Sequence, residues 1–117
     1  MKKFLLTTLL VAGVLLSCFA QKPHMVVFYN LENLFDTIND PDKLDEEFLP
    51  MGDKKWNSTK YQRKQSNIDK VFFDMAAINR EFPAVIGVSE IENRLVLEDL
   101  VVQPHMALGN YRIVHYD

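Results

Sequence analysis

Two oxygen-bearing side chains of this sequence, Asn30 and Glu90, each follow directly on a short apolar run. One amide oxygen and one carboxylate form a modest ligand set for a hard divalent cation such as Mg²⁺, which keeps several water molecules and readily shares a phosphate oxygen. A cation held there would stabilise charge that develops on phosphorus during phosphoester cleavage. The pair is therefore a candidate magnesium site, although spacing alone favours a plain surface carboxylate at Glu90.

The segments around these two residues predict a strand, a helix and a second strand. Residues 24–29 and residues 84–89 are short apolar runs rich in β-branched side chains, which is typical of buried strands that are covered on both faces. A strand–helix–strand unit is normally right-handed, with its strands parallel and close together. Open α/β sheets bind ligands at the carboxyl ends of their strands. We therefore expect Asn30 and Glu90 to project from the same edge of one sheet.

The segment between the two predicted strands contains an amphipathic helix of roughly 20 residues. Asn57 or Ser58 can cap its start, and Pro83 ends it because proline disfavours helix in the residue before it. Its apolar stripe, at intervals of three and four, consists of Tyr61, Lys64 or Gln65, Ile68, Val71 or Phe72, Met75 and Ile78. The pattern predicts a helix that packs one side against the sheet.

The remaining segments carry weaker signals. Residues 30–36 change the apolar period and suggest a turn or a short helical piece, and residues 37–57 read as a long, mostly solvated loop. A second helix is expected over about residues 94–102. Residues 111–116 alternate in character, which predicts a third strand.

The charge balance disfavours one class of function. The 117 residues include 13 basic and 16 acidic side chains, and 48% of them are hydrophobic, so neither wholesale disorder nor a disulfide scaffold with a single cysteine fits. Loss of residues 1–20 would remove Lys2 and Lys3 and leave 11 basic against 16 acidic residues. Without a basic stripe, a module that binds nucleic acid mainly by neutralising phosphates is disfavoured.

The first 20 residues predict an export signal. Two lysines precede an apolar run over residues 4–16, which is too short to span a bilayer comfortably and is closed by small residues, with a short membrane anchor as the alternative. Cleavage after Ala20 and cleavage before Cys18, where the preceding residues resemble a bacterial lipobox, both remain open. Cys18 therefore leaves with the leader or carries a lipid anchor, and in both cases thiol catalysis is excluded. We expect no stable membrane span and export to the periplasm, the cell surface or the medium.

Two segments of the chain resemble a known superfamily. The segment Phe-Tyr-Asn-Leu-Glu-Asn-Leu-Phe-Asp at residues 28–36 and the segment Ile-Gly-Val-Ser-Glu-Ile-Glu-Asn at residues 86–93 resemble the first two motifs of the endonuclease/exonuclease/phosphatase superfamily. Trp56, Asn57 and residues 114–117 resemble a secreted bacterial branch of it. The resemblance spans roughly residues 26–117.

The resemblance implies a four-layer α/β/β/α sandwich, as in deoxyribonucleases, that cleaves phosphoester bonds with Mg²⁺ or another divalent cation such as Mn²⁺ or Ca²⁺. Asn30 matches the family asparagine that positions metal or phosphate, and Glu90 matches its metal-binding glutamate. His115 occupies a position that can lie near the phosphate in the family, with a structural histidine as the alternative. The substrates implied are nucleic acids, inositol phosphates or phospholipid head groups, so nuclease and phosphatase both remain open.

The chain departs from the family because it lacks the later motifs, an Asp-x-Asn pair and a closing aspartate and histidine. We therefore expect residues 21–117 to be the amino-terminal part of such a domain, with an incomplete sandwich. The full-length protein would be a metal-dependent phosphodiesterase or phosphatase. This part alone is expected to lack appreciable hydrolase activity, and to aggregate or pack loosely because an apolar sheet face stays uncovered.

Two other functional classes remain open. One is a noncatalytic exported surface or envelope interaction protein that retains the fold. The other is a calcium-binding module that uses the acidic loop from Asp36 to Glu47, although this loop lacks the glycine and the terminal glutamate spacing of an EF-hand. Loss of divalent-ion binding in Glu90→Ala would favour the hydrolase, whereas loss only on substitution in the loop would favour the calcium module.

Overall fold

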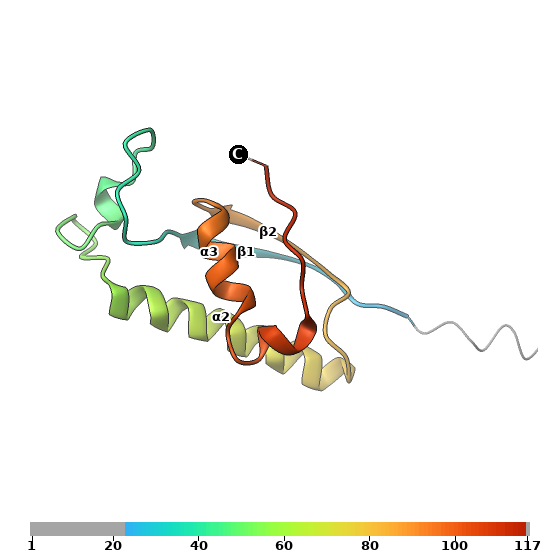
Figure 1. Cartoon of the computed structure of the whole chain (residues 1–117). Coiled ribbons are helices and arrows are strands. Elements are labelled where there is room, and N and C mark those ends of the chain that lie inside the picture. The colour runs from blue at the N-terminus through green and yellow to red at the C-terminus, as the bar shows by residue number, and fades with distance from the viewer. Residues whose placement is uncertain (1–22, 117) are drawn as a thin grey trace, which may run out of the picture.

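A computed structural model describes residues 23–116 and shows a mixed α/β fold (Figure 1). Strands β1 (Val26–Leu34) and β2 (Val85–Ile91) pair in parallel, and helices α2 (Ser58–Asn79) and α3 (Arg94–Val101) lie on one side of them. Two 3₁₀ helices complete the description, η1 (Glu46–Phe48) and η2 (Met106–Gly109). The predicted strand–helix–strand order with parallel strands is confirmed. The expected signal peptide, with both cleavage points, lies outside the described residues.

Helix α2 begins and ends close to the positions that the sequence indicates. The side chain of Asn57 caps the helix, because its Oδ1 accepts a hydrogen bond from the Lys60 main-chain N–H at 3.1 Å. The helix ends where Arg80 adopts a left-handed conformation with φ of 60°. Ile78 was expected on the buried stripe but is 81% exposed, because it points to the other side of the helix from the buried Phe72 and Ala76.

The core lies between the sheet and the two helices. It consists of Leu31, Leu34, Ile68, Phe72, Val96, Leu97, Leu100 and Met106. Tyr29 packs the edge of its ring against Phe72, with ring centroids 5.8 Å apart. Burial of each large apolar side chain stabilises the fold by about 1.5–3 kcal/mol. Because Leu31 and Leu34 belong to this core, the end of β1 is anchored on the helices.

The first strand is longer than predicted and is covered on one face only. Residues 30–36 were expected to form a turn or a helical piece, but β1 continues to Leu34. Val26 and Phe28 are 71% and 74% exposed, while Val27 and Tyr29 alternate with them and pack against the core. Coverage on both faces, as expected from the apolar run, is therefore wrong for the part of the chain described.

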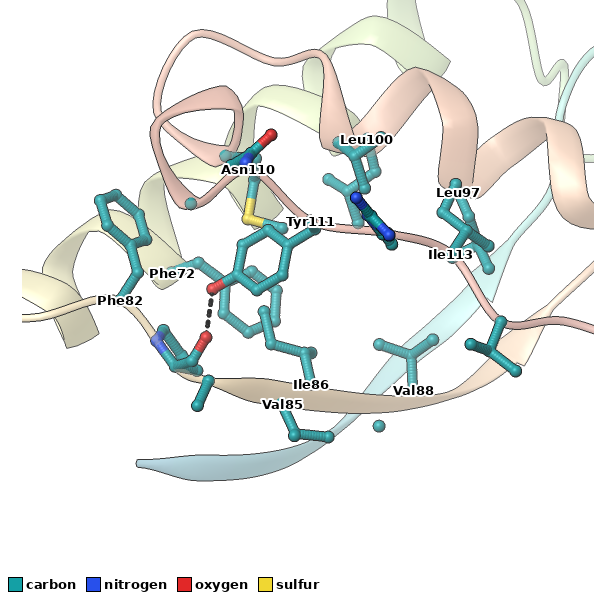
Figure 2. A pocket seen from close by; sticks show the side chains of 18 of the residues that line it. Phe72, Phe82, Val85, Ile86, Val88, Leu97, Leu100, Asn110, Tyr111 and Ile113 are labelled. Atoms are coloured by element: carbon teal, nitrogen blue, oxygen red, sulfur yellow. Dashed lines mark hydrogen bonds between the residues drawn. The ribbon is translucent and has the colours of Figure 1, made fainter. Parts of the chain in front are cut away.

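The prediction of a third strand over residues 111–116 is also wrong. This segment shows no strand pairing, although its side chains alternate between half-buried and exposed. It runs beside β2 across a groove of about 720 Å³, and Tyr111 bridges the groove by donating a hydrogen bond to the Pro83 carbonyl at 2.8 Å (Figure 2). A strand needs a neighbouring backbone for its ladder, and the groove separates this segment from β2.

The long loop is held by aromatic side chains and is less solvated than expected. Phe35 and Phe48 stack with ring centroids 4.1 Å apart, and Trp56 meets Phe48 edge-on. The indole N–H of Trp56 donates a hydrogen bond to the Phe35 carbonyl at 2.9 Å. Two acidic side chains are buried here, Asp45 of the loop and Asp36 directly before it. The loop therefore packs onto the end of the sheet, next to the carboxyl ends of the strands.

Candidate functional site

Asn30 and Glu90 meet at the same edge of the sheet, as the strand order predicts. Asn30 is paired in register with Ser89, so Glu90 stands one residue further along the neighbouring strand. The Asn30 amide Nδ2 donates a hydrogen bond to Glu90 Oε1 at 2.7 Å, and both side chains are exposed to solvent. The contact brings one amide and one carboxylate together at this edge, with the amide nitrogen turned toward the carboxylate.

A bulge in β1 follows directly after Asn30. Asn30 pairs with Ser89 and Leu34 pairs with Ile91. Between these two pairs β1 has three residues, whereas β2 has only Glu90. Such bulges bend a strand and redirect its side chains, and they are frequent beside active sites. Both Asn30 and Leu34 stay attached to the ladder, so the bulge is confined to the three residues between them.

The backbone at this edge is strained in both strands. Glu32, Asn33 and Glu90 have φ angles of 51°, 61° and 56°, in the left-handed region that favours glycine. Each such conformation costs on the order of 1–3 kcal/mol for a residue with a side chain, and persists only where the surroundings enforce it. Strain of this kind concentrates at functional sites, and three of the six left-handed residues that are not glycine among residues 23–116 lie at this edge, which supports it as a candidate site.

Several contacts hold the strained residues in place. The Glu32 main-chain N–H donates to Asn30 Oδ1 at 2.7 Å, so the Asn30 amide both donates and accepts. The Lys64 ammonium, from α2, donates to the carbonyls of Glu32 and Asn33. Buried leucines on either side of the left-handed pair fix the bulge on the core. The direction of the Asn30 side chain is thus set by the backbone around it.

The donor set fits a hard cation that retains water. Residues 23–116 contain no group of three or more histidine, cysteine, aspartate or glutamate side chains that could hold a metal ion. Tetrahedral zinc sites need three or four such ligands, so zinc does not fit. One carboxylate with one amide oxygen suits Mg²⁺ or a similar ion, whose remaining ligands are water and substrate oxygens. Amide and carboxylate oxygens each carry two lone pairs, so the Asn30–Glu90 contact leaves capacity for a cation.

A positive charge stands beside the two acidic groups of the site. Partial burial lowers the pKa of Lys64, while the nearby carboxylates of Glu32 and Glu90 oppose that change. The ammonium also lies 5.7 Å from the ring centroid of Trp56. Sequence reasoning missed both Glu32 and Lys64. Lys64 could have been found, since a lysine within an apolar helical stripe needs a polar partner on the packed side.

The structure places the third predicted site residue in another environment. His115 is half-buried and lines the groove between β2 and residues 111–116, together with Val88 and Ile91. Asn30 and Glu90 do not line this groove. Figure 2 shows that apolar side chains from β2 and from the helices face into it. The role of His115 near a phosphate stays a prediction.

The acidic loop uses its carboxylates to hold its own backbone. Glu92 Oε2 accepts the Asp36 N–H at 2.8 Å, and Asp36 accepts both the Ile38 N–H and the Asn93 side-chain amide. Asp45 Oδ2 accepts the N–H of Asp40 at 2.9 Å. One oxygen of each of these three carboxylates thus holds the main chain of the loop, and residues 23–116 contain no group of three or more histidine, cysteine, aspartate or glutamate side chains that could hold a metal ion, so a calcium module gains no support there.

Comparison with known protein families gives a match over most of the chain. A family model described as "Endonuclease/Exonuclease/phosphatase family" matches residues 25–117, which include both strands, both helices and the Asn30–Glu90 pair. Comparison with curated proteins and with solved structures gives no significant match. None of the helices among residues 23–116 is long and apolar enough to cross a bilayer.

Proposed function

The chain belongs to the endonuclease/exonuclease/phosphatase family, and on this premise we propose that it forms the cation-binding edge of an exported, metal-dependent phosphoester hydrolase. Family membership places it among the phosphoester hydrolases in general. The observation that supports metal dependence is the 2.7 Å contact between Asn30 and Glu90 at a strained strand edge. The two-stranded sheet with helices on one side fits one half of the α/β/β/α sandwich.

In this proposal Glu90 holds a divalent cation such as Mg²⁺, Mn²⁺ or Ca²⁺, and Asn30 adds its amide oxygen. When bound, the ion supplies Lewis-acid stabilisation of charge on a phosphoryl oxygen. The Asn30 amide N–H holds the Glu90 carboxylate in one orientation, and the bulge holds Asn30. The nearby Lys64 ammonium adds a fixed positive charge that favours a phosphate anion at this edge.

One carboxylate and one amide do not complete a hydrolytic site. Activation of the attacking water needs a base, and charge stabilisation in this chemistry normally needs further polar groups. We therefore expect the 117-residue chain alone to bind a cation weakly and to show no appreciable turnover. Measurable metal-dependent hydrolysis by the purified chain would contradict this expectation.

The test of the proposal is cation binding at Glu90. Calorimetric titration of the whole chain with Mn²⁺ should give one weak site, and Glu90→Ala should reduce its affinity by about tenfold or more. Glu98→Ala is the matched control, because Glu98 is an exposed carboxylate paired with Arg94 on α3. Equal affinity in the wild-type chain and in Glu90→Ala would refute the proposal.

We also propose that the protein is exported. The proposal is supported by the order of two lysines, an apolar run and small residues within residues 1–20. Mass spectrometry of the mature protein separates the two processing routes. A mature end at Gln21 supports cleavage after Ala20, and a diacylglyceryl mass on Cys18 supports a lipid anchor. A mature protein that retains residues 1–20 would contradict both.

A further inference from the structure

Lys64 lies on the side of α2 that faces the sheet. It is half-buried, and its ammonium donates to the main-chain carbonyls of Glu32 and Asn33, the second at 3.2 Å. The Trp56 ring covers it from the loop side. A lysine that gives up part of its hydration in this way needs strong acceptors, and main-chain carbonyls provide them.

The two carbonyls that Lys64 binds belong to the bulge of β1. Between Asn30 and Leu34 the ladder to β2 is interrupted, so Glu32 and Asn33 are not paired in register with β2. Both residues are left-handed, and their carbonyls take donors from outside the ladder, the Asn33 carbonyl also from the Phe35 N–H at 3.1 Å. Lys64 supplies donors to both from a single ammonium group.

We propose that Lys64 is a positioning residue for the Asn30–Glu90 pair. It binds the two carbonyls and so fixes the bulge, and the bulge fixes the direction from which Asn30 meets Glu90. The connection runs through the Asn30 amide, whose Oδ1 accepts the Glu32 N–H while its Nδ2 donates to Glu90 Oε1. The consequence for cation binding rests on the proposed function, whereas the effect on the Asn30–Glu90 contact does not.

The charge of Lys64 alone would have the opposite effect on a cation. A positive charge close to Glu90 repels a divalent ion, so its removal should tighten cation binding if charge were the main contribution. If Lys64 acts by position, its removal should weaken binding, because the two oxygen ligands lose their common orientation. The sign of the change in affinity therefore distinguishes the two roles.

The first experiment measures Mn²⁺ affinity by calorimetry in the whole chain. We expect Lys64→Met to weaken binding about tenfold. Lys70→Met is the matched control and should leave the affinity unchanged, because Lys70 is an exposed lysine on the same helix that pairs with Asp74. Unchanged or tighter binding in Lys64→Met would overturn the proposal. If Lys64→Met does not unfold cooperatively, Lys64→Gln replaces it under the same criteria.

The second experiment needs no metal. In metal-free buffer, the NMR signals of the Asn30 side-chain amide report its hydrogen bond to Glu90, and Glu90→Ala gives the position of these signals without that bond. Lys64→Met should move the Asn30 signals toward the Glu90→Ala position, and Lys70→Met should not. Unmoved signals in Lys64→Met would overturn the proposal. If the wild-type chain binds no Mn²⁺, the proposed function fails, and this comparison still decides the role of Lys64.

Discussion

Glu92 shows how a single carboxylate can oppose stability at neutral pH. One of its oxygens accepts the Asp36 N–H, and the other is buried without a hydrogen-bond partner among the described residues. Burial raises the pKa of Glu92 above its ordinary value, and the carboxylates of Asp36 and Asp45 raise it further, against the lowering effects of the Asp36 N–H and Lys43. The charged form is therefore disfavoured in the folded state.

This environment predicts the effect of Glu92→Gln on stability. Because the pKa of Glu92 is higher in the folded than in the unfolded chain, the folded state binds the proton more tightly. This stabilises the fold at pH values below the unfolded pKa, and the stabilisation is lost as the pH rises through the folded pKa. Glutamine keeps the acceptor for Asp36 and carries no charge. We expect Glu92→Gln to raise the free energy of unfolding at pH 7 by less than about 1 kcal/mol, because partial exposure screens the charge. Near pH 3.5 the gain should vanish.

Urea unfolding of both chains at the two pH values measures this difference. Glu98→Gln serves as the control, since Glu98 is an exposed carboxylate whose partner, Arg94, lies one helical turn away. A gain for Glu92→Gln that is equal at both pH values would show that the charge of Glu92 is not its cause.

At the scale of elements, the start of α2 tests which residue caps the helix. The sequence left Asn57 and Ser58 as alternatives, and the structure assigns the cap to Asn57 through its bond to the Lys60 N–H. Asn57→Ala should lower the free energy of unfolding by about 1 kcal/mol, because a main-chain N–H in the first turn loses its acceptor. Ser58→Ala, one residue further, should change it by a few tenths of a kcal/mol at most. Similar losses in the two variants, measured by urea unfolding, would contradict this assignment.

The order of the elements could be predicted because each has a strong local signal. The stripe on α2 has helical periodicity, Asn57 and Pro83 bracket it, and the runs around Val27 and Ile86 are apolar and β-branched. From that order alone it followed that Asn30 and Glu90 would meet at one edge. The Asn30–Glu90 contact therefore follows from the strand–helix–strand order, and local sequence patterns are enough to predict that order.

The bulge could not be predicted, because its left-handed residues are glutamate and asparagine and no glycine marks it. Its conformation results from contacts with distant parts of the chain, above all with Lys64, and local sequence patterns do not contain such contacts.

The strand predicted over residues 111–116 is absent for a related reason. Their alternating pattern is real, but a strand also depends on a partner backbone, and the groove beside β2 keeps the two segments apart.

At the scale of the whole molecule, the two faces of the sheet differ sharply. One face packs against α2 and α3, and the other exposes Val26, Phe28 and Val85. Val26 and Phe28 alternate along β1, and Val85 is the register partner of Val26, so the three side chains lie together on one face. Adjacent exposed apolar side chains on a sheet with unpaired edges favour association between molecules.

We therefore expect the chain to self-associate, and Phe28→Ser to reduce that association. Phe28 is 74% exposed and lies over Gly87, so its replacement removes apolar surface with little loss of core packing. Sedimentation velocity over a range of concentrations should show a larger monomer fraction for Phe28→Ser than for the unmodified chain. The control is Ile78→Ser, which removes an apolar side chain that is 81% exposed, close to the value for Phe28, from the far end of α2. An equal increase in monomer fraction in the two variants would show that the association depends on exposed apolar surface in general. An unmodified chain that stays monomeric at all concentrations would show that the uncovered sheet face does not cause association.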